Sequence, residues 1–514
     1  MCSFYGNYYT IMLKLGFREI NGEGYDGMNF IREMDVVVIG GGVTGTAILR
    51  ELSKYDLKCM LVEKEPDLAL GTTKANSAII HSGFDAPYGS KKALTNVRGN
   101  RLYHELQDQL GLDIKWLGSL VVAVDDEEMA TLRDLLARGI KNGVKNLEIL
   151  DREATLAKEP NLKKDIKGAL WAPTAGVCWP FEVALSFARC AVQNGAEVLT
   201  HCTVEKILTE GGKVIGISTS MGNIKAKYVI NAAGLYADTV ARTAGDNTFT
   251  IHPRKGEYIL FDKTASEVLV KGIVFPTPTK TSKGILICTT VHGNTFIGPN
   301  AQDQEDKDDK ATTSAGMNEI ISSSQKLIGK LPLGKAITEF SGLRAVSDTG
   351  DFIIRESTVT GLIHAAGIQS PGLSAAPAIA EEVLELLRDA EPDLGLKRNF
   401  KAVLPKRKVF SELKKQEQAK LCSENELYAR IICRCETVTE GEIVDAIHET
   451  CGARTLDGIK RRTRAGMGRC QGGFCGPKVT QILSRELGIP ITEVLKEGIN
   501  SAMFYEKEPA GEDA

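Results

Sequence analysis

The chain has 514 residues, of which 43% are hydrophobic and 25% charged, and its formal net charge is −3. This length predicts about three domain-sized units, and the composition is typical of a soluble globular protein. The weak negative charge argues against a nucleic-acid-binding protein, and no apolar run approaches the roughly 20 residues that a membrane-spanning helix needs.

Residues 1–33 form the first recognisable segment. They show no helical or strand periodicity, and they lack the order of basic, apolar and small residues that marks a signal peptide. We expect a loose N-terminal extension here, with the globular part of the chain beginning at about residue 34.

A strand, a glycine turn, a helix and a second strand are predicted over residues 35–63. The turn reads Gly40-Gly41-Gly42-Val43-Thr44-Gly45 and follows an apolar strand. In this pattern the first glycine allows the tight turn, the second lets backbone approach a pyrophosphate, and the third lets helix and strand pack closely. The helix N-terminus then offers free N–H groups to the phosphates.

An acidic residue closes this unit. Glu63 ends the second strand 18 residues after Gly45, close to the spacing of an acceptor for a ribose 2′-hydroxyl. A free 2′-hydroxyl is present in FAD and NAD but not in NADP. The unit alone predicts a dinucleotide site and leaves open which of the two cofactors it binds.

Three further segments narrow this choice. They are Thr72–Gly83, Val229–Gly234 and His364–Leu373, and the last reads as a strand, a glycine turn and a new helix start. With these segments, residues 34–390 resemble the D-amino-acid-oxidase-like superfamily of FAD enzymes. The resemblance implies that the first segment lines the flavin, the second closes the nucleotide site, and the third places a helix N-terminus beside the flavin, where its dipole stabilises negative charge.

The resemblance implies an α/β fold class, α+β overall, with a Rossmann-like FAD-binding domain and a β-rich substrate domain. We expect the FAD-binding domain to comprise residues 34–84, 145–247 and 340–390, and the substrate domain residues 85–144 and 248–339. The implied FAD contacts are Gly40, Gly42, Val43, Thr44, Gly45, Glu63, Lys64, Thr73, Asn76, Ser77, Val204, Ala233, Gly234, Gly367, Ile368, Gly372 and Leu373.

Residues 391–426 are expected to be a basic linker. Within them, residues 397–420 hold nine Lys or Arg against two acids. Such a run is either a solvated connection or a basic patch on which a partner docks. A compact unit is then expected over residues 427–496, followed by a tail over residues 497–514.

Four of the twelve cysteines are grouped in this last unit as Cys433 and Cys435, then Cys470 and Cys475. Clustered thiols in an otherwise scattered set are typical of metal binding in a reducing compartment, so we expect a cytoplasmic protein. Structural zinc sites usually have C-x₂₋₄-C spacing, whereas thiolates also hold [2Fe–2S] clusters. The spacing leaves both metals open.

Residues 433–443 and 461–475 resemble the bacterioferritin-associated-ferredoxin-like [2Fe–2S] domain. The resemblance is greatest to the version at the C-terminus of the A subunits of anaerobic glycerol-3-phosphate dehydrogenases, and it implies an iron–sulfur cluster on the four thiols. Arg461, Arg462 and Arg464 then stabilise the anionic cluster, meet a partner's acids, or form a solvated helix face. Thr439 is expected to cap a helix that begins at residue 440.

The superfamily oxidises C–N or C–O bonds by hydride transfer to flavin, and the resemblance implies the catalytic residues. Arg344 matches a position where an arginine meets an anionic substrate, although a structural ion pair is the alternative. His81 is the implied base, or else a hydrogen-bond partner of the flavin. Ser370 and Lys283 are further candidates for binding the anion. Tyr258, like His292, either lines the pocket or only packs.

The resemblance therefore implies an FAD-dependent dehydrogenase that oxidises sn-glycerol 3-phosphate to dihydroxyacetone phosphate. Electrons would pass from FAD through a [2Fe–2S] cluster to a second flavoprotein or another acceptor subunit, with membrane contact only through such partners. The turn over residues 367–373 also resembles L-2-hydroxyglutarate dehydrogenases, so a 2-hydroxy acid stays open as substrate. An amine substrate and a non-catalytic electron-transfer subunit are further alternatives.

Overall fold

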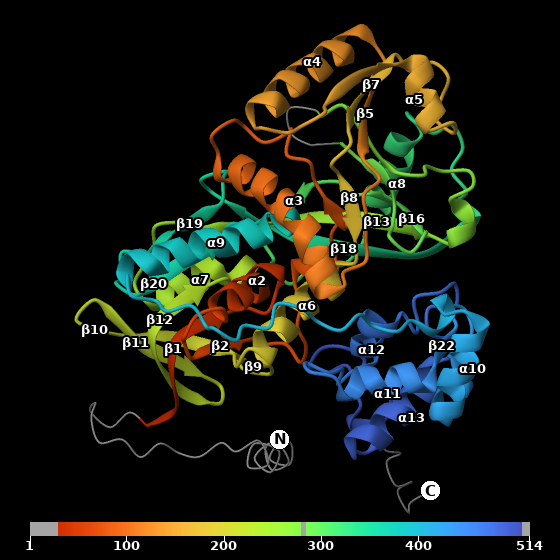
Figure 1. Ribbon diagram of the computed structural model, residues 1–514. Helices are drawn as coiled ribbons and strands as arrows, with labels where there is room; N and C mark the ends of the chain where they lie inside the picture. Colours follow the sequence, from red (N-terminus) through yellow and green to blue (C-terminus); the bar gives the residue numbers. More distant parts are fainter. Residues whose placement is uncertain (1–28, 279–283, 506–514) are drawn as a thin grey trace, which may run out of the picture.

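Two large sheets, of eight and nine strands, organise most of the chain, and a helical unit follows them at the C-terminus (Figure 1). The computed structural model describes residues 29–278 and 284–505. Lys283, most of the expected N-terminal extension and the end of the expected tail lie outside these residues. None of the described helices is both long and apolar enough to cross a lipid bilayer.

The eight-stranded sheet has a parallel core that carries the glycine turn. Its strands are β1 (Phe30–Ile39), β2 (Cys59–Val62), β9 (Glu197–Leu199), β10 (Val204–Glu210), β11 (Lys213–Thr219), β12 (Gly222–Asn231), β19 (Ile353–Glu356) and β20 (Leu362–Ala366). Strand β1 runs parallel to both β2 and β12, and β12 runs parallel to β20. The carboxyl ends of these four strands therefore meet at one edge.

Strand β1 begins at Phe30, four residues inside the stretch expected to be a loose extension. Residues 30–33 pair with the start of β12, and Lys225 binds Glu33 at 2.8 Å. The sequence did not predict this, because Phe30, Ile31, Arg32 and Glu33 do not alternate between apolar and polar side chains. The backbone ladder to β12, which is distant in the chain, forms the strand.

Four helices cover one face of this sheet: α2 (Val43–Leu52), α3 (Lys91–Leu110), α6 (Pro180–Gln193) and α9 (Gly372–Ala390). Val36 and Val38 of β1 pack against them, whereas Val37 and Ile39 pack on the opposite face beneath β10 and β11. Successive side chains of a strand point to opposite faces, so a run of apolar residues is what a strand buried on both faces requires.

The nine-stranded sheet makes the upper half of Figure 1. Its strands are β5 (Ser119–Ala123), β6 (Glu148–Asp151), β7 (Gly168–Ala172), β13 (Ile251–Phe261), β14 (Ile273–Pro276), β15 (Leu286–Thr289), β16 (Thr295–Gly298), β17 (Gln302–Asp303) and β18 (Ala336–Ser347). The helices α4 (Asp126–Lys141), α5 (Arg152–Lys158) and α8 (Ser314–Ser324) flank it. A small sheet of β3 (Ile79–Ile80), β8 (Gly176–Cys178) and β4 (Ile114–Lys115) adjoins both halves.

The strand pairing differs from the expected division at residue 145. Strands β6 and β7 fall in a stretch assigned to the FAD-binding domain, yet β7 pairs with β5 and β6 in the nine-stranded sheet. Conversely, α3 falls in the expected substrate part but packs against α9 beside the parallel sheet. Contacts between distant segments, which no local pattern reveals, decide both assignments.

The expected linker is attached to the surface along its length. Lys397 donates its backbone N–H to the carbonyl of Lys54, and Leu404 donates its backbone N–H to the carbonyl of Gln109, both at 2.8 Å. The segment also contains the helix α10 (Lys415–Glu424). The segment therefore lies along the helices of the first sheet as far as the C-terminal unit and is not a free linker.

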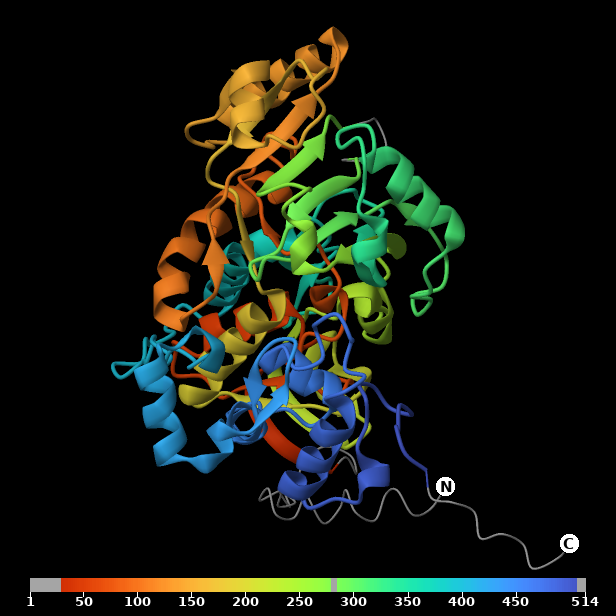
Figure 2. The ribbon, with the colours of Figure 1, turned by 90° about the vertical axis from the view of Figure 1, so that its right-hand side faces the viewer.

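The C-terminal unit has its own apolar core, which includes Ile443, Ile447, Ile459 and Leu483. Its elements are β21 (Ile431–Cys433), β22 (Val438–Thr439), α11 (Glu440–His448), α12 (Leu456–Thr463) and α13 (Gly476–Leu487). The predicted cap on α11 is confirmed, because Thr439 Oγ1 accepts from the N–H of Glu442 at 3.2 Å. Figure 2 shows the unit seated against the lower half of the molecule.

Candidate active site and thiol cluster

A cavity of about 560 Å³ opens at the carboxyl edge of the parallel sheet. Ligands of open α/β sheets bind at this edge because the turns after the strands converge there. The facing wall comes from the nine-stranded sheet. Residues from the parallel-sheet turns include Gly40, Glu63, Ala232 and Ile368, and those from the facing wall include Tyr258, Phe275 and Arg344.

The glycine turn is shaped for close backbone approach. Gly40 has a φ of +108°, and a Cβ there would lie 2.4 Å from the carbonyl oxygen of Ala232. A Cβ on Gly45 would lie 1.9 Å from the carbonyl oxygen of Gly40. Gly42 precedes α2 without a side-chain cap, and the first N–H groups of a helix have no intrahelical partner. The N–H of Val43 donates to Thr73 Oγ1, and the positive end of α2 lies at the cavity.

Glu63 supplies a carboxylate at the same end of the cavity. Its Oε2 accepts from the N–H of Gly41 at 2.6 Å and its Oε1 from the N–H of Glu65 at 2.9 Å. Burial raises the pKa of this carboxyl although both N–H groups act in the opposite direction. The glycine turn, the open helix start and this acid together fit the pyrophosphate and ribose of a dinucleotide.

Most of the cofactor contacts expected from the sequence border this cavity. They are Gly40, Gly42, Val43, Thr44, Glu63, Lys64, Thr73, Asn76, Ser77, Ala233, Gly234, Ile368, Gly372 and Leu373. Gly45, Val204 and Gly367 do not line it. Gly45 packs α2 onto the turn, Val204 packs into the core beneath β10, and Gly367 forms the turn after β20 with a φ of +65°.

At the other end of the cavity, Arg344 projects from β18. Its guanidinium donates to the backbone carbonyls of Asn300 at 3.0 Å and of Lys255 at 3.3 Å. Within residues 29–278 and 284–505 no carboxylate lies at ion-pair distance from it, and burial lowers its pKa. Arg254, which also lines the cavity, is by contrast bound by both oxygens of Asp303. Arg344 is therefore a partly buried cation with donors left for an anionic ligand.

His81 lies on the cavity wall together with Arg344. Its backbone is fixed from two sides, because its N–H donates to Ser374 Oγ at 2.7 Å and its carbonyl accepts from Asn100 at 3.2 Å. Its imidazole lies 6.0 Å from the ring of Phe275. Ser370, in the turn before α9, lines the same cavity, so three of the four expected catalytic residues come together.

The two aromatic candidates, Tyr258 and His292, differ in their position relative to the cavity. Tyr258 lines the cavity, where its hydroxyl lies 3.3 Å from Ser77 Oγ and its ring stacks on Phe340 at 4.6 Å. His292 does not line it: its ring packs edge-on to Trp179 at 4.8 Å, and burial together with Arg464 lowers its pKa to about 2. Sequence reasoning missed the cavity residue Phe275, because no motif surrounds it and only the placement of β14 brings it there.

The four grouped thiols form two pairs. Cys435 Sγ lies 3.7 Å from Cys470 Sγ. The Cys475 thiol, outweighing burial and helped by nearby N–H groups, lowers the pKa of Cys433 to about 6. No group of three or more His, Cys, Asp or Glu side chains surrounds a single metal position in the part of the chain that the structure describes. Two pairs of thiols fit a [2Fe–2S] cluster, in which each iron takes two protein ligands.

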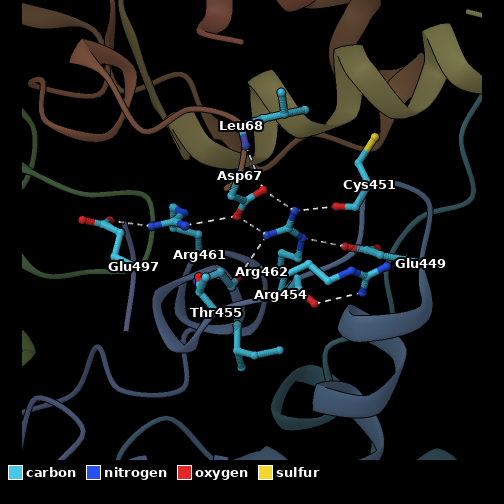
Figure 3. A network of polar contacts seen from close by, with 12 residues as sticks. Asp67, Leu68, Glu449, Cys451, Arg454, Thr455, Arg461, Arg462 and Glu497 are labelled. Atoms are coloured by element: carbon cyan, nitrogen blue, oxygen red, sulfur yellow. Dashed lines mark hydrogen bonds and ion pairs between the residues drawn. The ribbon is translucent and has the colours of Figure 1, made fainter. Parts of the chain in front are cut away.

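Arg461 and Arg462 of α12 take none of the three roles considered from the sequence, because both bind an acid of the same chain. Arg462 binds both oxygens of Asp67 at 2.8 Å, and Arg461 binds Asp67 at 3.0 Å (Figure 3). Both arginines are buried. Arg464 pairs with Glu436 at 2.8 Å. Arg461 and Arg462 thus lie toward the parallel-sheet half of the molecule, where Asp67, which the local sequence did not identify, neutralises them.

Two family models match the chain. The one described as FAD dependent oxidoreductase covers residues 35–386, and the one described as BFD-like [2Fe-2S] binding domain covers residues 431–485. The chain belongs to the FAD dependent oxidoreductase family. The match confirms the predicted fold class, enzyme class and both predicted cofactors.

Three relatives place the chain within this family. It is 47% identical over 469 residues to a glycerol 3-phosphate dehydrogenase of Caloramator mitchellensis, covering 90% of this chain and 96% of that protein. An L-2-hydroxyglutarate dehydrogenase of Bos taurus is 34% identical over 52% of this chain and 60% of its own length. The structure of an L-alpha-glycerophosphate oxidase from Mycoplasma pneumoniae with FAD bound has a TM-score of 0.68 and 32% identity, covering 73% of this chain and 99% of that one.

Proposed function

We propose that this oxidoreductase oxidises sn-glycerol 3-phosphate to dihydroxyacetone phosphate and passes the electrons to a protein acceptor. The observation that carries the proposal is Arg344, a partly buried cation that has no carboxylate partner among the described residues and that borders one cavity with His81. An anion receptor that borders the same cavity as an ionisable base suits an anionic secondary alcohol. The relative that covers 90% of the chain is named for this substrate.

Different residues of this chain bind the substrate and accept its proton. FAD bound by the glycine turn, Glu63 and the neighbouring cavity residues would supply the acceptor for the hydride of the secondary carbon. The guanidinium of Arg344 holds the phosphate by charge-assisted hydrogen bonds. The imidazole of His81 accepts the proton of the hydroxyl oxygen as the carbonyl forms. Ser370 Oγ orients the substrate from the turn before α9, and Lys283 stays a candidate for a second phosphate contact.

We further propose that the acceptor docks where the thiols reach the surface. A [2Fe–2S] cluster, when bound, transfers electrons one at a time. Cys435 is exposed, and Phe474, between the last two thiols, is 84% exposed. The exposed cations Arg434 and Arg469 flank them. An aromatic side chain within a basic rim suits an acidic protein surface, such as that of a second flavoprotein.

The compartment that best fits these thiols is the cytoplasm, with membrane contact only through a partner. All eleven cysteines among the described residues are free, and five of the scattered ones are buried. Unpaired thiols in this number are typical of a reducing compartment.

Anaerobic reduction of the enzyme-bound flavin tests the substrate. We expect sn-glycerol 3-phosphate to bleach the flavin absorption and L-2-hydroxyglutarate to leave it unchanged at the same concentration. His81→Ala should slow the bleaching while FAD content is retained. Bleaching by L-2-hydroxyglutarate alone would reassign the substrate to the 2-hydroxy acids. No bleaching by either compound, with FAD present, would support a non-catalytic subunit.

A further inference from the structure

One segment contacts both the cavity and the C-terminal unit. Every residue from Leu70 to Ser77 lines the cavity. Ala69 donates its N–H to the carbonyl of Gly41 at 2.9 Å, and Thr73 Oγ1 accepts from the N–H of Val43 at 2.9 Å. Residues 67–77, defined here as the cavity loop, therefore hold the glycine turn and the start of α2 in place.

The C-terminal part of the chain binds the cavity loop through ion pairs at two points. At the first, Asp67 accepts from Arg461 and from both terminal nitrogens of Arg462, at 2.8–3.0 Å. At the second, Lys74 Nζ lies 2.5 Å from Glu497 Oε2. Arg461 joins the two points, because its other terminal nitrogen binds Glu497 Oε1 at 2.8 Å (Figure 3). Asp67, Arg461, Glu497 and Lys74 thus form a chain of ion pairs whose two ends lie on the cavity loop.

The first of these contacts, between Asp67 and the two arginines of α12, is deeply buried. Asp67 is 5% exposed and Arg462 is 1% exposed. Arg462 also lies 3.4 Å from Glu449, which neutralises its remaining charge. Removing one member of a buried cluster leaves a charge that is neither paired nor hydrated, and this is strongly unfavourable. The arrangement therefore fixes the unit on the cavity loop in one orientation.

We propose that Arg461 and Glu497 are positioning residues for the FAD site, so that docking of the C-terminal unit and retention of FAD depend on each other. Neither residue lines the cavity, and each acts through the cavity loop. Coupling between two sites is reciprocal, so FAD binding stabilises the docked unit by the same factor by which docking strengthens FAD binding. The proposal concerns the cofactor site and stands independently of the proposed substrate.

Glu497→Gln in the full-length protein gives the most direct test, because Glu497 is partly exposed and its amide replacement is well tolerated sterically. It removes the charge that binds both Lys74 and Arg461. Lys263→Met is the matched control: Lys263 pairs with Glu436 of the C-terminal unit at 3.0 Å, outside the cluster around Asp67, and is not in contact with the cavity loop. Two quantities are measured after deflavination: the Kd for added FAD, and amide hydrogen exchange of residues 67–77 without FAD.

We expect the Kd for FAD to rise about tenfold in Glu497→Gln, within the range typical of coupled sites, and to change less than about twofold in Lys263→Met. Exchange of the cavity loop should become faster only in the first variant. Asp67→Asn should show the same pattern more strongly. If Asp67→Asn does not fold, the result for Glu497→Gln alone tests the proposal. An unchanged Kd in Glu497→Gln, or an equal rise in Lys263→Met, would overturn the proposal.

Discussion

Replacing Arg344 by glutamine removes the cation to which we assign the substrate phosphate. Two of its five N–H donors serve backbone carbonyls, which leaves up to three for a ligand. Two hydrogen bonds to a charged group are together worth about 3 to 4 kcal/mol. The expected loss in kcat/KM is therefore roughly 10²- to 10³-fold.

The assay is stopped-flow reduction of the bound flavin by sn-glycerol 3-phosphate without oxygen, with FAD content and the melting temperature measured in parallel. Arg344→Lys should recover part of the loss, because it restores the charge without the planar fork. Arg254→Gln is the control. That side chain also borders the cavity, but Asp303 already binds its guanidinium, so the loss should stay below about tenfold. A kcat/KM for Arg344→Gln equal to that of Arg254→Gln would refute the assignment.

Three more predictions follow from the geometry. Gly45→Ala drives a Cβ to 1.9 Å from a carbonyl oxygen, so it should destabilise the fold by about 1–3 kcal/mol and impair FAD binding in a spectrophotometric titration, whereas Gly334→Ala meets nothing within 4 Å and should do neither. Cys435→Ser should lose iron and the visible absorption of the cluster while keeping FAD, and Cys422→Ser, outside the thiol cluster, should keep both. Burial opposes ionisation of Asp67, but the guanidinium groups outweigh it and lower its pKa to about 2, so about 2 kcal/mol of stability is present above about pH 4 and is lost as the pH falls toward 2. Urea unfolding of wild type and Asp67→Asn at about pH 5 and pH 3 should show a difference that shrinks with acidity, and a difference independent of pH would contradict this origin.

The parts of the fold that the sequence reveals are those coded locally. The glycine turn, Glu63 and the capping of α11 each depend on residues within one short segment, and spacing alone predicts them. His81 and Arg344 are remote in the chain, and the family resemblance, not periodicity, suggested that they meet. The structure then shows that both border the same cavity.

What the sequence does not reveal depends on contacts between distant segments. Residues 30–33 form a strand only because β12 lies beside them, and β6 and β7 join the sheet that their pairing with β5 dictates. Arg461 and Arg462 looked like solvated or cluster-facing charges because their partner, Asp67, lies almost 400 residues earlier. Burial of charge is a tertiary property, and no local pattern reports it.

If substrate is oxidised in the cavity, its electrons should reach a cluster held by the grouped thiols. The most direct measurement is an anaerobic titration of the full-length protein with sn-glycerol 3-phosphate, followed by flavin absorption and by the EPR signal of a reduced [2Fe–2S] cluster. We predict that the flavin bleaches and that the cluster signal then appears. Bleaching without that signal, in a sample where dithionite does produce it, would contradict the account.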